Sequence, residues 1–144
     1  MESFLSFNNA GEPGVGKTLL VRSIAAKTNA FLTLVNGPEI LSAYLGESEQ
    51  ALRNVFDEAI KNAKKETSRP VLIFIDEVDS ICQARDEKDT GNEGRIVTQL
   101  CTLFDKIALM RRQRVVVIGA TNRPNTIDNS LRRPGALFGF PPLR

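Results

Sequence analysis

Two short segments of this chain combine residue types that bind phosphate groups and a divalent metal ion. Residues 11–18 read Gly-Glu-Pro-Gly-Val-Gly-Lys-Thr, which fits the pattern G-x-x-x-x-G-K-[ST]. Glycines let backbone N–H groups surround phosphate oxygens, and the N-terminus of a following helix adds the positive end of its dipole. We therefore predict a phosphate-binding loop that leads into a helix. Its expected residues are Gly11, Glu12, Pro13, Gly14, Val15, Gly16, Lys17, Thr18 and Leu19.

The second segment is an apolar run over residues 71–75, which ends in Asp76 and Glu77. The run is typical of a buried parallel strand, and ligands bind beyond the carboxyl ends of such strands. Lys17 would place its charge between the β and γ phosphates, while the Thr18 hydroxyl and Asp76 would hold Mg²⁺. Glu77 would orient and deprotonate the attacking water. A plain strand-to-helix turn is the alternative for the Gly-rich segment, and the acidic pair argues against it.

Composition limits the functions that the chain can have. It has 144 residues, 42% of them hydrophobic, which is enough for one domain with a real core. The net charge of +2 is too small to predict a nucleic-acid or membrane partner. Histidine is absent, which excludes histidine zinc sites and Ser-His-Asp triads. The two cysteines, Cys82 and Cys101, follow apolar residues and are interpreted as small core residues.

Neither a leader peptide nor a membrane-spanning segment is expected. The first residues lack a basic region before an apolar stretch, and no apolar run approaches the roughly 20 residues that a bilayer requires. We therefore expect an intracellular chain without membrane insertion, located in the cytoplasm or alternatively in the nucleus.

Strands and helices are expected to alternate, which favours a parallel sheet with helices on both faces. Strands are predicted over residues 4–7, 31–35, 71–75 and 115–118. Helices are predicted over residues 17–27, from a cap at Ser48 to residue 65, and over residues 95–107, while residues 83–94 should form a surface loop. The strand ends would bring residues 76–77 and residues 119–124 to the same edge of the sheet.

Four segments carry a resemblance to a known family: GEPGVGKT, NGPEI followed by YLGESE, VLIFIDEVDS, and GATNRPNTIDNSLRRPG. Over residues 8–135 the chain resembles the AAA+ ATPases, closest to the branch of valosin-containing protein and the N-ethylmaleimide-sensitive fusion factor. The resemblance implies an α/β P-loop NTPase sandwich of three layers, with a parallel sheet and with ATP and Mg²⁺ as ligands. It assigns residues 1–135 to the nucleotide-binding domain, incomplete at both ends, and residues 136–144 to a divergent tail without the family's helical lid.

The resemblance also implies roles for residues outside the two phosphate segments. Asn122 would sense the γ-phosphate and position water, although an Asn before Arg-Pro is also a common turn residue. Tyr44, Leu45 and Gly46 resemble the loop that grips a polypeptide in the central pore of hexameric rings; alternatively, Tyr44 packs at the start of the next helix. Arg133 matches an arginine finger that acts on the neighbouring subunit's ATP. The second finger would fall at position 136, where this chain has Ala.

These features predict an ATPase module that unfolds, extracts or disassembles protein substrates within a homo- or hetero-hexamer. The alternative is a module that binds ATP without hydrolysing it and assembles with, or regulates, a full-length ring. The missing arginine and lid favour the alternative, and Glu77 favours the enzyme. A DNA-remodelling ATPase is disfavoured by the near-neutral charge and by Tyr44 to Gly46.

Overall fold

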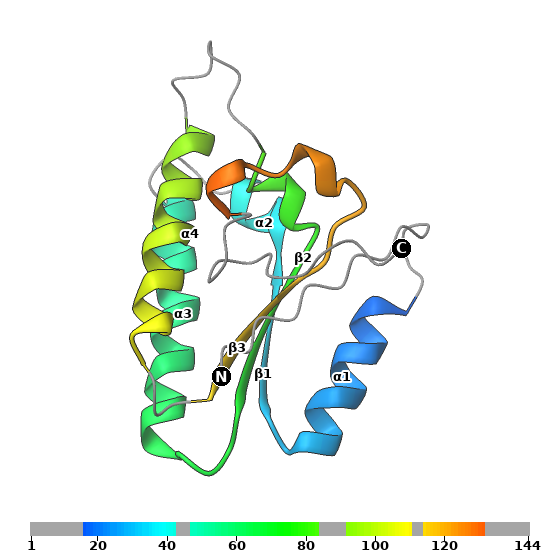
Figure 1. Ribbon diagram of the computed structural model, residues 1–144, viewed down its shortest axis with the longest axis vertical. Coiled ribbons are helices and arrows are strands. Elements are labelled where there is room, and N and C mark those ends of the chain that lie inside the picture. Colours follow the sequence, from blue (N-terminus) through cyan, green and yellow to red (C-terminus); the bar gives the residue numbers. More distant parts are fainter. Residues whose placement is uncertain (1–15, 43–46, 84–91, 111–113, 132–144) are drawn as a thin grey trace.

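A parallel sheet, of which the described residues contribute three strands, lies between the helices. The computed structural model describes residues 16–42, 47–83, 92–110 and 114–131. Within them the strand order is β1 (Phe31–Asn36), β2 (Val71–Asp76) and β3 (Val115–Gly119). In Figure 1 the helices α3 (Glu47–Lys65) and α4 (Asn92–Ala108) cover one face of this sheet, and α1 (Lys17–Thr28) covers the other. The predicted α/β class with a three-layer arrangement is confirmed.

The central strand β2 is buried on both faces, as its apolar run predicts. Val71, Ile73 and Ile75 belong to the larger core cluster, which is shared with α3 and α4. Leu72 and Phe74 point the other way and pack with residues of α1 and β3. All five side chains are buried. Successive side chains of a strand point to opposite faces of the sheet, so those of β2 alternate between two hydrophobic cores and not between core and solvent.

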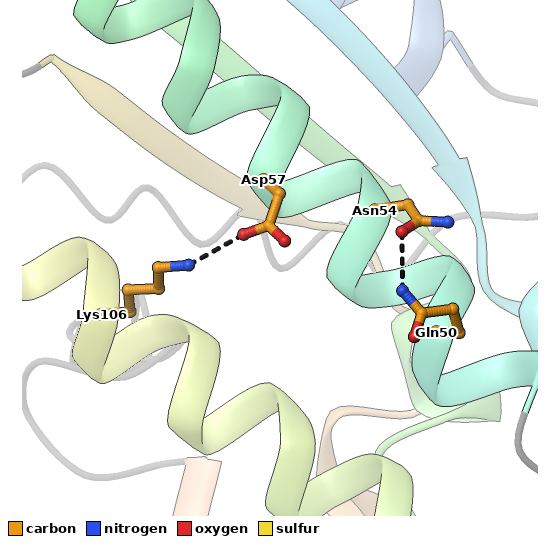
Figure 2. Close-up of polar contacts among 4 residues, drawn as sticks. All are labelled: Gln50, Asn54, Asp57 and Lys106. Carbon is orange, nitrogen blue, oxygen red and sulfur yellow. Dashed lines mark hydrogen bonds and ion pairs between the residues drawn. The ribbon is translucent and has the colours of Figure 1, made fainter.

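Helices α3 and α4 pack against each other through aromatic side chains and are joined at their surface by polar contacts. The rings of Phe56 and Phe104 have centroids 5.9 Å apart at an interplanar angle of 53°. Lys106 of α4 forms an ion pair of 2.8 Å with Asp57 of α3, as Figure 2 shows. These contacts hold the helices as one layer over the sheet.

The boundaries of these helices differ from two expectations. Helix α3 begins at Glu47, so Ser48 is a buried residue of its first turn and not the residue before the helix. Helix α4 begins at Asn92, which assigns to it the last part of the predicted surface loop. The apolar periodicity that predicted both helices starts later than the hydrogen bonding, since polar residues occupy the first turns.

Short elements connect the strand ends to the helices. Helix α2 (Gly37–Ser42) follows β1 directly and was not predicted. The 3₁₀ helix η1 (Val78–Ser80) follows the acidic pair, and η2 (Pro124–Thr126) and η3 (Asn129–Leu131) follow β3. Among the helices that the structure describes, none is both long and apolar enough to cross a membrane.

Candidate nucleotide site

The acidic pair lies at the carboxyl end of β2, beside the loop that follows β3. Asp76 is the last residue of β2 and is half-buried, whereas Glu77 is exposed. Ala120 lies next to both strands, because its N–H donates to the Ile75 carbonyl at 2.8 Å and its carbonyl accepts from the Val78 N–H at 2.9 Å. The expectation that the two strand ends meet at one edge is thereby confirmed.

Glu77 has a left-handed backbone conformation, with φ of 49° and ψ of 46°. This region is unfavourable for a residue with a side chain, and such conformations cluster at functional sites. Two hydrogen bonds hold it: the Glu77 N–H donates to Asp76 Oδ1, and the Glu77 carbonyl accepts from the Ser80 N–H, both at 2.9 Å. The turn therefore joins the end of β2 to η1 at the acidic pair.

Gly37, at the start of α2, packs directly against this turn. A Cβ atom on Gly37 would lie 2.3 Å from Ser80 Oγ and 2.5 Å from the Glu77 carbonyl oxygen. Both distances are shorter than any van der Waals contact allows. The position therefore requires glycine for lack of space, and the backbone of α2 supports the turn that carries Glu77.

The start of α1 faces the same edge of the sheet. Gly16 precedes the helix with φ of 70°, a left-handed conformation that glycine adopts without a steric penalty. No acidic residue occurs in the first turn of α1. The Lys17 ammonium donates a hydrogen bond of 2.5 Å to Asn122 Oδ1, which joins the start of the helix to the loop after β3.

This set of groups fits a nucleoside triphosphate with Mg²⁺. The ammonium of Lys17 and the N-terminus of α1 suit phosphate oxygens, and the Thr18 hydroxyl and the Asp76 carboxylate suit Mg²⁺, which prefers oxygen ligands. In the described part of the chain, no group of three or more His, Cys, Asp or Glu residues could hold a metal on its own. Mg²⁺ commonly takes one or two carboxylates and completes its shell with phosphate oxygens and water.

Several predicted site residues lie outside the described residues. They are Gly11, Glu12, Pro13, Gly14, Val15, Tyr44, Leu45, Gly46 and Arg133. Of the predicted phosphate-loop residues that are described, Lys17 and Thr18 are half-buried and Leu19 is 69% exposed. The structure brings Lys17 and Asn122 together and places the Asp76–Glu77 turn beside the Asn122 loop.

The sequence interpretation missed a second hydrogen-bonded link between these loops. The Thr121 hydroxyl donates to Asp79 Oδ1 at 2.7 Å and accepts from the Arg123 N–H at 2.9 Å. An acid two residues after Glu77, and a Thr directly before Asn122, are the signals that could have indicated it.

The cysteines belong to the larger hydrophobic core: Cys82 is part of it, and Cys101 packs against it. Cys82 is fully buried, as predicted, whereas Cys101 is only half-buried. Burial raises the pKa of the Cys82 thiol, and the neighbouring Cys101, Asp79 and Asp128 raise it further. A thiol that stays protonated is a poor nucleophile, so Cys82 serves as packing.

Sequence comparison relates the chain to known proteins. The sequence profile of the ATPase family associated with various cellular activities (AAA) matches residues 9–140. Protein SAV of Sulfolobus acidocaldarius is 52% identical over 125 residues, which is 87% of this chain and 15% of that protein. The chain therefore spans about 15% of the length of this curated relative.

Proposed function

Because the chain belongs to the ATPase family associated with various cellular activities (AAA), we propose that it binds Mg·ATP at this edge of the sheet and hydrolyses it. The observation that carries the proposal is the Lys17–Asn122 hydrogen bond, which brings the phosphate-binding end of α1 to the loop after β3. That loop is joined to the Asp76–Glu77 turn by the backbone hydrogen bonds of Ala120. The residues to which this proposal gives electrostatic and acid–base roles thus lie at one edge of the sheet, which supports the proposal.

In the proposed mechanism each side chain has a separate task. Lys17 would bind the β and γ phosphates as a point charge, and Thr18 and Asp76 would hold Mg²⁺. When bound, the metal ion would neutralise part of the charge on the phosphate oxygens. Glu77 accepts a proton from the attacking water, and Asn122 orients that water against the γ-phosphate. As the water oxygen bonds to the γ-phosphorus, the bond to the β–γ bridging oxygen breaks and ADP leaves. The exposed position of Glu77 supports this role, because the carboxylate must reach water in front of the sheet edge.

The finer assignment is also a proposal. We place the chain in the branch of valosin-containing protein and the N-ethylmaleimide-sensitive fusion factor, as a module that remodels protein substrates within a hexameric ring in the cytoplasm or nucleus. Tyr44, Leu45 and Gly46 would grip the substrate, and Arg133 would act on ATP bound to the neighbouring subunit. Support comes from the four sequence segments that the resemblance rests on.

A second candidate is a module that holds ATP without hydrolysing it. The observation that favours it is Ala136, where the family pattern has a second arginine finger. Arginine fingers contribute about 10³ to 10⁵ in turnover, so the loss of one can suppress hydrolysis while binding persists.

Nucleotide binding and phosphate release on the purified chain test both candidates. A fluorescent ATP analogue is titrated in the presence of Mg²⁺, with Lys17→Ala and Glu77→Gln as variants and Lys27→Ala and Glu58→Gln as matched surface controls. We expect Lys17→Ala to weaken binding by about 10- to 100-fold, the value of a hydrogen bond to a charged group. Glu77→Gln should bind normally and lose phosphate release by about 10²-fold or more.

The outcomes separate the candidates. Binding that depends on Lys17, without phosphate release from the unmodified chain, would favour the ATP-holding module. Binding that is unaffected by Lys17→Ala would contradict both.

A further inference from the structure

Asp79 has no task in the mechanism proposed above, yet the structure connects it to the loop that carries Asn122. The Thr121 hydroxyl donates a hydrogen bond to Asp79 Oδ1 and accepts one from the Arg123 N–H. Along the chain, Asn122 lies between Thr121, which is bonded to Asp79 through this hydroxyl, and Arg123, whose N–H donates to the same hydroxyl. The arrangement holds the backbone on both sides of Asn122.

The Thr121 hydroxyl is buried and hydrogen-bonded. Thr121 is only 3% exposed, and a buried hydroxyl is unfavourable unless it has hydrogen-bond partners. This hydroxyl uses both its donor and its acceptor capacity, and its partner Asp79 supplies a carboxylate, which strengthens the bond. The Thr121 side chain is therefore fixed in one orientation.

The link also begins where the backbone pairing stops. The backbone hydrogen bonds that extend the pairing of β2 with β3 end at Ala120. The next residue, Thr121, is joined to the β2 side through its side chain. The Asp79 carboxylate thus carries the connection one residue closer to Asn122 than the sheet itself does.

The position of Asp79 gives a second argument. It lies in η1, two residues after Glu77 and three after Asp76, so it is the third acidic side chain in this short segment. Like charges at close range are unfavourable, and a neutral residue would avoid this cost. A hydrogen-bonding task for the carboxylate accounts for an acid at this position.

We propose that Asp79 is a positioning residue: through the Thr121 hydroxyl, its carboxylate fixes Asn122 at the place where the γ-phosphate and the attacking water meet. The inference rests on the proposed function for the role of Asn122, but the hydrogen-bonded link itself does not depend on it. In this proposal Asp79 acts through its hydrogen bond with Thr121 and takes no part in the chemical step itself.

The first test measures turnover. Thr121→Val removes the hydroxyl while it keeps the shape, and we expect kcat to fall about 10- to 100-fold with KM changed less than about threefold, as for a misplaced catalytic group. Thr121→Ser should restore kcat, and Asp79→Ala should reproduce the loss. Thr126→Val is the matched control, since it removes a hydroxyl that bonds the Arg123 carbonyl from the other side of the loop.

A double variant then separates positioning from general loop stability. If Asp79 and Thr121 act through Asn122, Thr121→Val should cause no further loss in an Asn122→Ala background. If the fold-losses in kcat of Thr121→Val and Asn122→Ala multiply in the double variant, the proposal is wrong. It is also wrong if Thr126→Val lowers kcat as much as Thr121→Val does.

The second test needs no turnover. By NMR, Thr121→Val should speed hydrogen exchange of the Arg123 amide by about tenfold and shift the side-chain amide signals of Asn122, while Thr126→Val leaves those Asn122 signals in place. Unchanged Arg123 exchange and unchanged Asn122 signals in Thr121→Val would overturn the positioning role. If the signals move but Asn122→Ala hydrolyses ATP normally, the link exists and the proposed function of Asn122 is what fails.

Discussion

Lys17 and Asn122 stand 105 positions apart in the chain, and the Lys17 ammonium donates a hydrogen bond to the Asn122 side-chain oxygen. A neutral amide oxygen is a weaker acceptor for an ammonium than a phosphate oxygen. A γ-phosphate should therefore compete for Lys17 and release Asn122 for its own contact.

The first prediction follows from this competition. Mg·ATPγS should shift the side-chain amide signals of Asn122 in NMR spectra more than Mg·ADP does, because only the triphosphate has a γ-phosphate. Asn54 is a suitable internal control, since its amide accepts a hydrogen bond from Gln50 on the surface of α3 (Figure 2). Equal shifts of Asn122 with both nucleotides would contradict the competition.

The second prediction concerns the contact of Gly37 with the Glu77 turn. Gly37→Ala forces a Cβ atom to within 2.5 Å of the Glu77 carbonyl, so the turn must move. We expect a loss of about 1–3 kcal/mol in the free energy of unfolding, measured in urea, and a lower rate of phosphate release. Pro38→Ala, at the neighbouring exposed position, should change both quantities little. A Gly37→Ala variant as stable and active as the unmodified chain would show that α2 does not support the turn.

The third prediction contrasts two contacts between α3 and α4. Phe104 is 1% exposed and packs on Phe56, so Phe104→Ala should cost about 3–5 kcal/mol in the free energy of unfolding. The Lys106–Asp57 ion pair has side chains that are 52% and 58% exposed, so Lys106→Ala should cost about 1 kcal/mol or less. Urea unfolding of both variants measures the contrast. Equal losses would mean that the exposed ion pair contributes as much to stability as the buried aromatic contact, which would contradict the prediction.

The fourth prediction concerns pH. Burial raises the pKa of the Cys82 thiol above its ordinary value of 9.0, so the folded chain keeps a proton that the unfolded chain releases above that pH. The free energy of unfolding should be insensitive to this group below pH 9 and should fall above it, by up to about 1.4 kcal/mol per pH unit.

Urea unfolding of the unmodified chain and of Cys82→Ala, under reducing conditions, isolates this contribution. The two stability curves should run parallel below pH 9 and converge above it, because only the unmodified chain has the thiol. Cys101→Ala keeps the buried Cys82 thiol, so the free energy of unfolding of this variant should still fall above pH 9. Parallel curves up to pH 10.5 would contradict the assignment.

The sequence predicted the elements whose pattern is local. The apolar run of β2 and the apolar stripes of α3 and α4 are visible in single segments, and the acidic pair after β2 marks the site edge. The short helix α2 was missed because its six residues are too few for a periodic pattern.

The contacts that were missed join distant segments. Thr121 meets Asp79 across 42 positions, and Gly37 meets the turn at Glu77 and Ser80. Such pairs depend on the register of neighbouring strands, with Asn36 opposite Asp76 and Ile75 opposite Gly119, which no single segment specifies. The candidate site residues could therefore be predicted from their residue types and motif positions. The contacts that hold them in place could be found only from the structure.

Because the backbone at Glu77 is left-handed, selection for stability and selection for activity favour different residues at this position. Glycine and asparagine adopt this conformation at lower cost than glutamate, by about 1 kcal/mol for glycine before its larger unfolded-state entropy is counted. Variants chosen for thermal stability alone would thus tend to replace Glu77 by one of these residues, and with it the proposed base. Engineering a more durable form of this chain should hold position 77 constant and seek its gains in the α3–α4 layer.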